Sequence, residues 1–124
     1  MQKLTKAEEE IMQIIWQLER CTVSDILDVI ERTDSERGRP PHSSISTIVR
    51  ILEEKNFLDH KAYGKTYEYF PTVSKEAYGK NTLSKFITDY FDGSPQSLVS
   101  FLVKEENLDA TELKKLLDKL DGRG

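Results

Sequence analysis

Hydrophobic residues recur every three or four positions in the first half of the chain, which is the period of a helix with one buried face. Before the first such run, Thr5 and Glu8 form the pattern of a capping box, in which two side chains satisfy free backbone N–H groups. The buried positions expected of this helix are Ala7, Ile11, Ile14, Ile15 and Leu18. Thr22 and Asp25 give the same signal for a second helix, with buried positions at Val23, Ile26, Leu27 and Ile30.

The third hydrophobic run lies in residues 41–54 and predicts a capped helix with a polar outer face. Its buried stripe is Ile45, Ile48, Val49 and Leu52, and the opposite face holds Ser43, Thr47, Arg50 and Glu54. A purely solvated face more often alternates Lys and Glu, whereas this face has short hydroxyl side chains and one long cation. Such a surface suits close approach to the major groove of DNA. The alternative is that the hydroxyl residues only mark the start of a helix.

A predicted β-hairpin follows this helix directly. Residues 57–58 and 67–70 are strand-forming runs rich in aromatic residues, and Gly64 between them allows a tight reversal. A free helix face followed by a hairpin with a cationic tip is the layout of a winged helix-turn-helix, whose wing contacts DNA phosphates. The DNA-binding residues that we predict are His42, Ser43, Ser44, Ser46, Thr47, Arg50, Lys61, Tyr63 and Lys65.

Between the second and third helices, residues 32–42 are rich in Gly, Pro and charge, and we predict a loop. This loop is longer than the turn of a minimal helix-turn-helix. Its cations Arg37 and Arg39 either contact phosphates or are simply solvated, and the second interpretation is slightly favoured.

From residue 74 onward the pattern predicts three short helices with wide apolar faces. They begin at Ser74, at Ser94 followed by Pro95, and at Asp109, and the first ends before Gly93. About fifty residues without a disulfide or a metal bury too little surface to be stable alone. We therefore expect a second copy to cover these faces in a twofold homodimer, the alternative being a monomer folded back on its first domain. The residues assigned to dimerisation are Leu83, Phe86, Ile87, Tyr90, Phe91, Leu98, Phe101, Leu102, Leu113, Leu116, Leu117 and Leu120.

Together these elements predict a mainly α fold with a small β-hairpin wing. Residues 1–73 are expected to form a winged helix-turn-helix DNA-binding domain, and residues 74–124 a C-terminal three-helix dimerisation domain. A dimer would present two recognition helices to successive major grooves, roughly 34 Å or a multiple apart. The expected partner is therefore a double-stranded DNA operator of palindromic sequence.

Charge and hydropathy refine this interpretation. The net charge of −4 and the pI near 5.3 argue against a nucleic-acid partner, yet residues 37–52 contain three cations and no acid. We expect moderate, salt-sensitive DNA affinity from such a local basic strip. No run of about eighteen apolar residues occurs, and the start of the chain lacks the apolar core of a signal peptide. A cytoplasmic location is the resulting expectation.

The sequence gives little support to an enzyme. It contains no Gly-rich phosphate loop, no His-Glu-x-x-His and no Gly-x-Ser-x-Gly. Cys21 is the single cysteine, so we expect a small buried hydrophobe and neither an intramolecular disulfide nor a thiolate cluster. His42 and His60 are far apart in sequence and are expected at the surface or in the wing, and His42 at a helix start suits a phosphate contact. We expect no cofactor, no metal and no small-molecule substrate.

A winged helix used only for protein contact, an adaptor that never binds DNA, is the competing functional class. Its sign would be an apolar outer face on the third helix. Ser43, Ser46, Thr47 and Arg50 are polar instead, and only Ile51 with the acidic Glu53 and Glu54 favours the adaptor.

With these elements in place, the chain resembles the penicillinase-repressor and methicillin-resistance-repressor family of bacterial transcription regulators. The resemblance covers nearly the whole chain and rests on residues 4–16, 44–52, 57–69, 97–99 and 104–106. It implies a homodimeric repressor that is released in a β-lactam response linked to antibiotic resistance. In such families a membrane receptor with a zinc-protease domain senses the β-lactam, and the repressor is then cut in its dimerisation domain.

The position that matches this cut is the bond between Phe101 and Leu102. Family members described in this way have Asn before the bond, whereas this chain has Phe101. A related branch senses copper through a C-terminal Cys-x-Cys array, and the lack of that array here speaks against a copper sensor.

Overall fold

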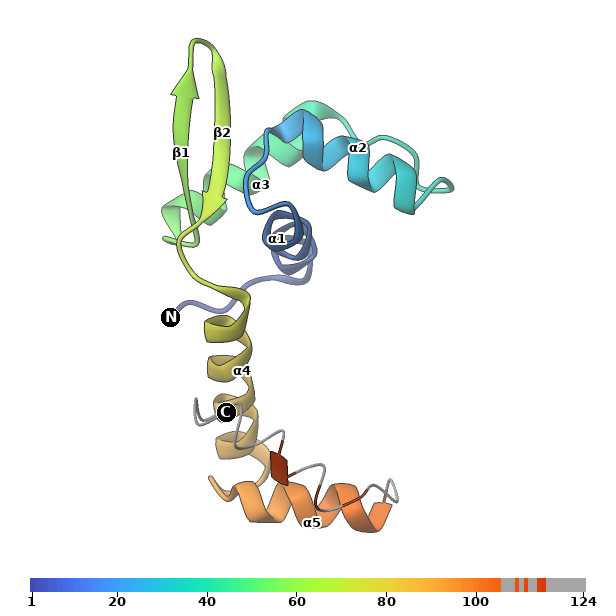
Figure 1. The fold of residues 1–124 in the computed structure, drawn as a ribbon, viewed down its shortest axis with the longest axis vertical. Helices are drawn as coiled ribbons and strands as arrows, with labels where there is room; N and C mark the ends of the chain where they lie inside the picture. The colour runs from blue at the N-terminus through green and yellow to red at the C-terminus, as the bar shows by residue number, and fades with distance from the viewer. Residues whose placement is uncertain (106–108, 110, 112–113, 116–124) are drawn as a thin grey trace. The chain divides into compact units, whose positions relative to one another are not determined.

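The computed structural model describes residues 1–105, 109, 111 and 114–115. Its named elements are five helices and one two-stranded antiparallel sheet (Figure 1). The chain divides into two compact units, the first Met1–Lys75 and the second beginning at Glu76. A mainly α fold with a β-hairpin wing is thereby confirmed. Within the described ranges, no helix is both long and apolar enough to cross a bilayer.

Helix α1 (Lys6–Leu18) begins at the predicted capping box and carries Ile11, Met12 and Ile15 into the core. The Glu8 N–H donates to Thr5 Oγ1 at 3.2 Å, and the Thr5 N–H donates to Glu8 Oε1 at 3.0 Å. The expectation that Ala7 is buried is wrong, because Glu8 takes the inward position and Ala7 is exposed. A carboxylate can occupy that position because it is hydrogen-bonded and paired there.

Helix α2 (Val23–Thr33) also begins at a capping box, formed by Thr22 and Asp25. Its apolar stripe is buried as predicted, through Val23, Ile26, Leu27 and Ile30. The helix includes Arg32 and Thr33, so the loop to the next helix spans residues 34–41 and is shorter than the sequence suggested.

Helix α3 (His42–Glu54) packs against α1 and α2 through Ile45, Val49 and Leu52, each at most 2% exposed. The expected side-chain cap is absent from this helix, whose N-cap position is occupied by Pro41. At the other end Asn56 adopts a left-handed conformation with φ of 66°, which turns the chain into the hairpin. The Phe57 N–H donates to the Leu52 carbonyl at 2.9 Å and closes this turn.

Strands β1 (Leu58–Tyr63) and β2 (Thr66–Pro71) form the hairpin that stands beside α3 in Figure 1. Tyr63 pairs with Thr66, so Gly64 and Lys65 make a two-residue turn, and Gly64 has the positive φ of 63° that such turns require. The base of the wing is fixed by a bridge between Cys21 and Tyr69, whose N–H groups donate to each other's carbonyls at 3.0 and 2.7 Å.

The second unit contains α4 (Lys75–Tyr90), except for its first residue, and α5 (Pro95–Glu105). Helix α4 ends at the predicted place, where the Gly93 N–H donates to the Ile87 carbonyl at 3.1 Å. Ser94 then caps α5, because its Oγ accepts the Ser97 N–H at 3.2 Å. The third predicted helix falls largely on residues outside those described, and so do four assigned dimerisation residues, Leu113, Leu116, Leu117 and Leu120.

Candidate nucleic-acid interface

The outer face of α3 is open to solvent. Ser43, Ser44, Thr47 and Arg50 are all exposed, and Glu54 lies exposed near the end of the same helix. The Thr47 hydroxyl donates to the Ser43 carbonyl at 2.9 Å, and Arg50 Nε donates to the Ser46 carbonyl at 3.4 Å. These side chains therefore lie along their own helix and leave room for a partner to approach it closely.

A groove of about 420 Å³ lies beside this face. It is lined by the start of α2, the first three turns of α3 and the turn end of β2, through Thr22, Val23, Ser24, His42, Ser46, Arg50, Lys65, Thr66, Tyr67 and Tyr69. The groove brings together four predicted DNA-binding residues, namely His42, Ser46, Arg50 and Lys65. No acidic residue is among those that line it, so its potential suits a polyanion.

The cations of the groove differ from those of the loop before α3. Among the residues that the structure describes, neither Arg50 nor Lys65 takes part in an ion pair. Arg37 Nη1 instead lies 2.6 Å from Glu10, and Arg39 Nη1 lies 2.7 Å from Asp28 and 2.9 Å from Glu31. The loop arginines are thus neutralised by acids of α1 and α2, whereas the charges of the groove remain available to a ligand.

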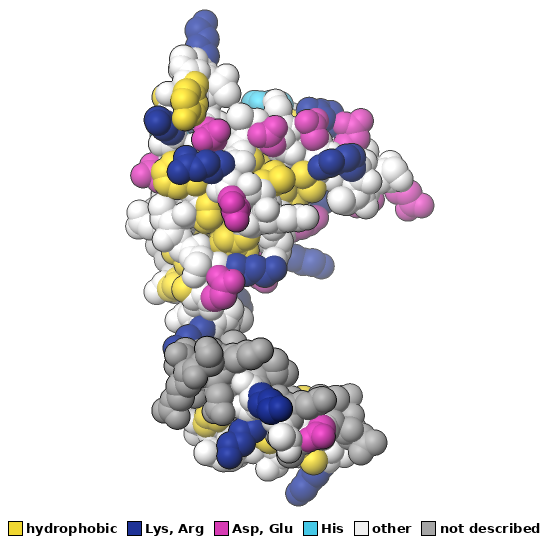
Figure 2. All heavy atoms as spheres, viewed as in Figure 1, with side chains coloured by type: hydrophobic (Ala, Val, Ile, Leu, Met, Phe, Trp, Pro, Cys, Tyr) yellow, Lys and Arg dark blue, Asp and Glu magenta, His cyan; other side chains and the backbone are white. Residues whose placement is uncertain are grey.

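A second groove, of about 550 Å³, contrasts with the first. It runs along α2 from the end of α1 and is lined by Leu18, Arg20, Asp25, Asp28, Val29, Glu31 and Arg32. Three of these residues are acidic, which makes this groove a poor site for DNA phosphates. Figure 2 shows the same mixture of charge, with a basic side chain at the tip of the hairpin and acidic side chains over the helices beside it.

The start of α3 has two features that suit an anion. The N-cap residue Pro41 provides no side-chain hydrogen bond, and its carbonyl accepts only the Ser44 N–H, at 3.1 Å, so the helix start can offer the N–H groups of His42 and Ser43 to an anion. His42 lies at this end and its Nδ1 is hydrogen-bonded to Ser46 Oγ at 3.1 Å. The pair fixes the imidazole ring at the mouth of the groove.

Two predicted wing residues lie away from the groove. Side chains alternate between the faces of a strand, so Lys61 and Tyr63 share the face opposite to that of His60 and Ala62. Lys61 Nζ lies 5.5 Å from the centre of the Tyr63 ring, within the range of a cation–π contact. Lys61 is therefore a basic side chain on the other face of the hairpin from the groove, opposite Glu68 on β2 and separate from Lys65.

Five polar or aromatic residues that line the groove were not predicted from the sequence: Thr22, Ser24, Thr66, Tyr67 and Tyr69. The two tyrosines are spaced by two residues, which places them on one face of a strand. That spacing is visible in the sequence, but which face turns toward α3 depends on the register of the hairpin. The start of α2 lies beside the hairpin because of the bridge between Cys21 and Tyr69, and nothing in the local sequence predicts that pairing.

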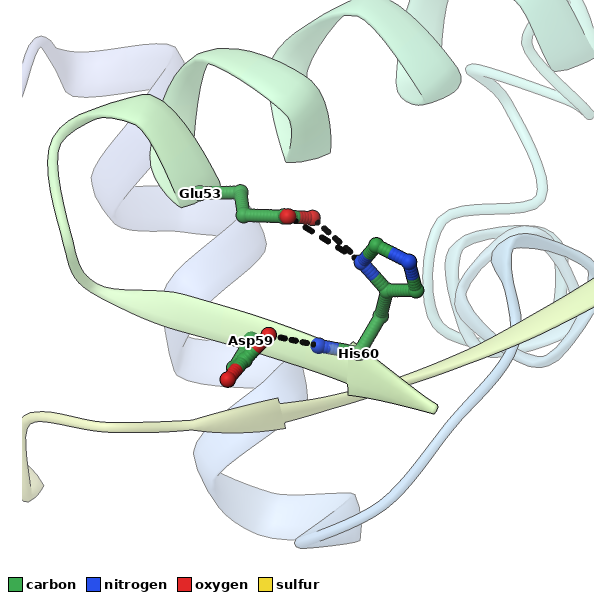
Figure 3. A group of neighbouring side chains, drawn as sticks. All are labelled: Glu53, Asp59 and His60. Carbon is green, nitrogen blue, oxygen red and sulfur yellow. Dashed lines mark hydrogen bonds and ion pairs between the residues drawn. The ribbon is translucent and has the colours of Figure 1, made fainter. Parts of the chain in front are cut away.

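Glu53, Asp59 and His60 form the one group in the described part of the chain with ligand atoms close enough for a metal ion, within 4.8 Å of one another (Figure 3). His60 Nδ1 donates to the Glu53 carboxylate at 2.8 and 3.1 Å, and Asp59 Oδ1 accepts the His60 backbone N–H at 2.8 Å. Asp59 and His60 are neighbours on a strand, so their side chains leave the backbone on opposite faces. The His60 ring is bonded to Glu53 and the Asp59 carboxylate to the backbone of His60, and this arrangement fits a structural contact between α3 and β1.

Comparison with known proteins identifies the chain. Residues 4–122 match the family model described as "Penicillinase repressor". The chain belongs to the penicillinase repressor family. The methicillin resistance regulatory protein MecI of Mammaliicoccus sciuri is 29% identical over 119 residues, covering 96% of this chain and 94% of that protein. The penicillinase repressor of Bacillus licheniformis is 21% identical, over 96% of this chain and 90% of that protein.

The chain is also similar to a solved structure. It is the solution structure of the DNA binding domain of the repressor BlaI, at a TM-score of 0.49 and 23% identity, covering 60% of this chain and 90% of that one. The relatives are named as regulators and repressors, so this family member is a regulatory protein and not an enzyme. Both the family resemblance and the expected non-enzymatic class are confirmed.

Proposed function

We propose that this penicillinase repressor family member is a transcriptional repressor that binds double-stranded DNA through α3 and the hairpin. The observation that carries the proposal is the groove free of acidic residues, where His42, Arg50 and Lys65 lie beside the exposed hydroxyl face of α3. Phosphates would meet His42 and Lys65 while the exposed hydroxyl face of α3, with Arg50 on it, enters the major groove. The names of MecI, the penicillinase repressor and the BlaI domain support the same function.

Homodimerisation through the second unit is the next part of the proposal. Phe86, Tyr90 and Phe101 are 46%, 73% and 46% exposed, an unusual amount of aromatic surface for two short helices. Their rings form a chain of contacts with Phe91, with centroids 5.0 to 5.8 Å apart. A second copy covering this surface would pair two recognition helices on a palindromic operator. Leu83, Ile87, Leu98 and Leu102 are half-buried or buried within the same helices.

Release by proteolysis completes the proposal. The matching bond between Phe101 and Leu102 lies inside α5, so a membrane sensor protease would reach it only after local opening of that helix. Cutting there would divide the apolar face of the helix and weaken the dimer. Each separated subunit could then bind only a single operator half-site. In this proposal the signal is a β-lactam and the protein acts in the cytoplasm.

Footprinting of the purified protein on DNA upstream of its own coding region tests the repressor function. We expect protection of a sequence with twofold symmetry, and binding to the same duplex that weakens steeply between about 50 and 200 mM salt. The adaptor function predicts neither result. A protein that protects no region and does not retard a random duplex at low salt would overturn the repressor proposal in favour of the adaptor.

A further inference from the structure

Tyr67 occupies a particular place in the hairpin. The register pairs Ala62 with Tyr67 and His60 with Tyr69, so these four side chains share one face of the two strands. Tyr67 is 47% exposed and lines the basic groove together with Arg50 and Lys65. A large aromatic side chain that is half open to solvent inside a charged groove is available to a ligand.

The ring of Tyr67 is held on two sides by aromatic neighbours. His60 stacks on it with centroids 4.3 Å apart and an interplanar angle of 20°. Tyr69 meets it edge-on, with centroids 6.5 Å apart at 71°, and is itself only 5% exposed. An exposed tyrosine on a hairpin usually samples several rotamers, and these contacts restrict the ring.

His60 connects this stack to α3. Its Nδ1 lies 2.8 and 3.1 Å from the two carboxylate oxygens of Glu53, in the last turn of α3 (Figure 3). An ionised carboxylate only accepts hydrogen bonds, so Nδ1 carries a proton and donates it. The result is a continuous contact from the helix through the imidazole to the phenol ring.

We infer that Tyr67 is a phosphate-contacting residue of the DNA interface, and that Glu53 and His60 are positioning residues that fix its ring relative to α3. The inference rests on the proposed function and specifies one contact within it. A phenol hydroxyl is a neutral donor, and tyrosine is among the side chains that bind DNA phosphates. Tyr67 lines the same groove as Arg50 and Lys65, and no acid lines it, so a phosphate oxygen is the acceptor that the surroundings favour.

The hydroxyl is tested with Tyr67→Phe in the full chain, by anisotropy of a fluorescein-labelled duplex that carries the footprinted sequence. We expect the affinity to fall about threefold to tenfold, the effect of one hydrogen bond. The fall should be equal on a random duplex, and the slope of affinity against salt should not change, because a phosphate contact is independent of sequence and no charge is removed. Thr33→Val also removes one hydroxyl, far along α2 from the groove, and serves as the matched control.

A double-mutant cycle tests the positioning role. If His60 acts by positioning the phenol hydroxyl, Tyr67→Phe should cause little or no further loss of DNA affinity in a chain that already carries His60→Ala. If the fold-losses in DNA affinity of the two single variants multiply in the double variant, His60 acts independently of the Tyr67 hydroxyl. That result would overturn its positioning role. His60→Phe, which keeps a ring for stacking but lacks the bond to Glu53, replaces His60→Ala in the cycle if thermal unfolding shows that His60→Ala is unfolded.

The outcomes separate the two proposals. If the unaltered chain binds the duplex and Tyr67→Phe binds equally well, the phosphate contact is overturned while the repressor function stands. If the unaltered chain binds neither duplex, the repressor function itself fails.

Discussion

Lys55 Nζ lies 2.5 Å from Glu8 Oε1, so the residue that follows α3 is paired with the first turn of α1. The Glu8 side chain is only 9% exposed and Lys55 only 22%, which distinguishes this pair from the ion pairs of the loop. Burial raises the pKa of Glu8, but hydrogen bonds from Lys55 and Thr5 together with the charge of Lys55 lower it more, so the net pKa lies below its usual range. The pair thereby fixes the end of the proposed recognition helix.

Lys55→Met should destabilise the first unit by about 1–3 kcal/mol, because Glu8 is left buried without its charged partner. Because the pKa of Glu8 is lowered in the folded chain, its ionised carboxylate contributes fully to the free energy of unfolding above the unfolded pKa of about 4.3. This contribution is lost as the pH falls through the folded pKa. Thermal unfolding from neutral to acid pH measures both effects. Lys6→Met, an exposed lysine on α1, is the control, and an equal loss in the two variants would contradict a special role for the pair.

Arg50→Ala should weaken binding to the operator by about 1–3 kcal/mol if the guanidinium reads a base edge. The loss on a random duplex should then be smaller, which anisotropy on both duplexes measures at one salt concentration. Thr47→Val is the companion variant on the same exposed face and should lower sequence discrimination with little change in melting temperature. An equal Arg50 loss on both duplexes would reassign that residue to the phosphate backbone.

Cys21 should be chemically inert in the folded protein. Burial, together with the charges of Asp25 and Glu68, raises the pKa of its thiol to about 12. Because the thiolate is the reactive species, iodoacetamide at a pH of about 8 should not modify the native chain within hours but should modify it rapidly in denaturant. Mass spectrometry reads the result, and rapid modification without denaturant would mean that the wing opens from the α1–α2 segment.

Asn56 provides a test of backbone strain at the end of α3. Its φ of 66° is left-handed, a conformation that glycine and asparagine adopt most readily. Asn56→Ala should cost about 1 kcal/mol, whereas Asn56→Gly should cost little or nothing. Urea unfolding of the two variants measures the difference, and equal stability would show that the conformation is relaxed in solution.

Tyr90→Asp should convert the proposed dimer into a monomer with little change in helicity, because Tyr90 is 73% exposed within its own chain. A charge placed in an apolar interface is left desolvated and unpaired, which opposes association. Sedimentation equilibrium reports the mass. Lys85→Asp lies on the same helix at an exposed position and should leave the mass unchanged. A Tyr90→Asp protein with the unaltered mass would exclude this surface from the interface.

The helices were predictable because their signals are local. Thr5 and Thr22 cap α1 and α2 as expected, and Ser94 with Pro95 marks the start of α5. The burial of Glu8 was not predictable, because its partner Lys55 lies 47 residues away along the chain.

The groove shows the same division between local and distant information. Arg50 and Lys65 were found from an amphipathic helix and a turn, whereas Thr22 and Tyr67 join them only through tertiary packing. The partners of Arg37 and Arg39 were also hidden, since ion pairs across a loop depend on how the loop folds. Periodicity therefore locates the helix that presents the surface but not the neighbours that complete it.

The bridge between Cys21 and Tyr69 has a mechanical consequence. Two backbone hydrogen bonds join Tyr69, in the middle of β2, to Cys21, the residue before the N-cap of α2. The base of the hairpin is therefore anchored to the start of α2. A displacement of the hairpin at Tyr69 either moves the start of α2 or breaks these two bonds. Deflection of the hairpin is therefore transmitted to the helix that supports α3.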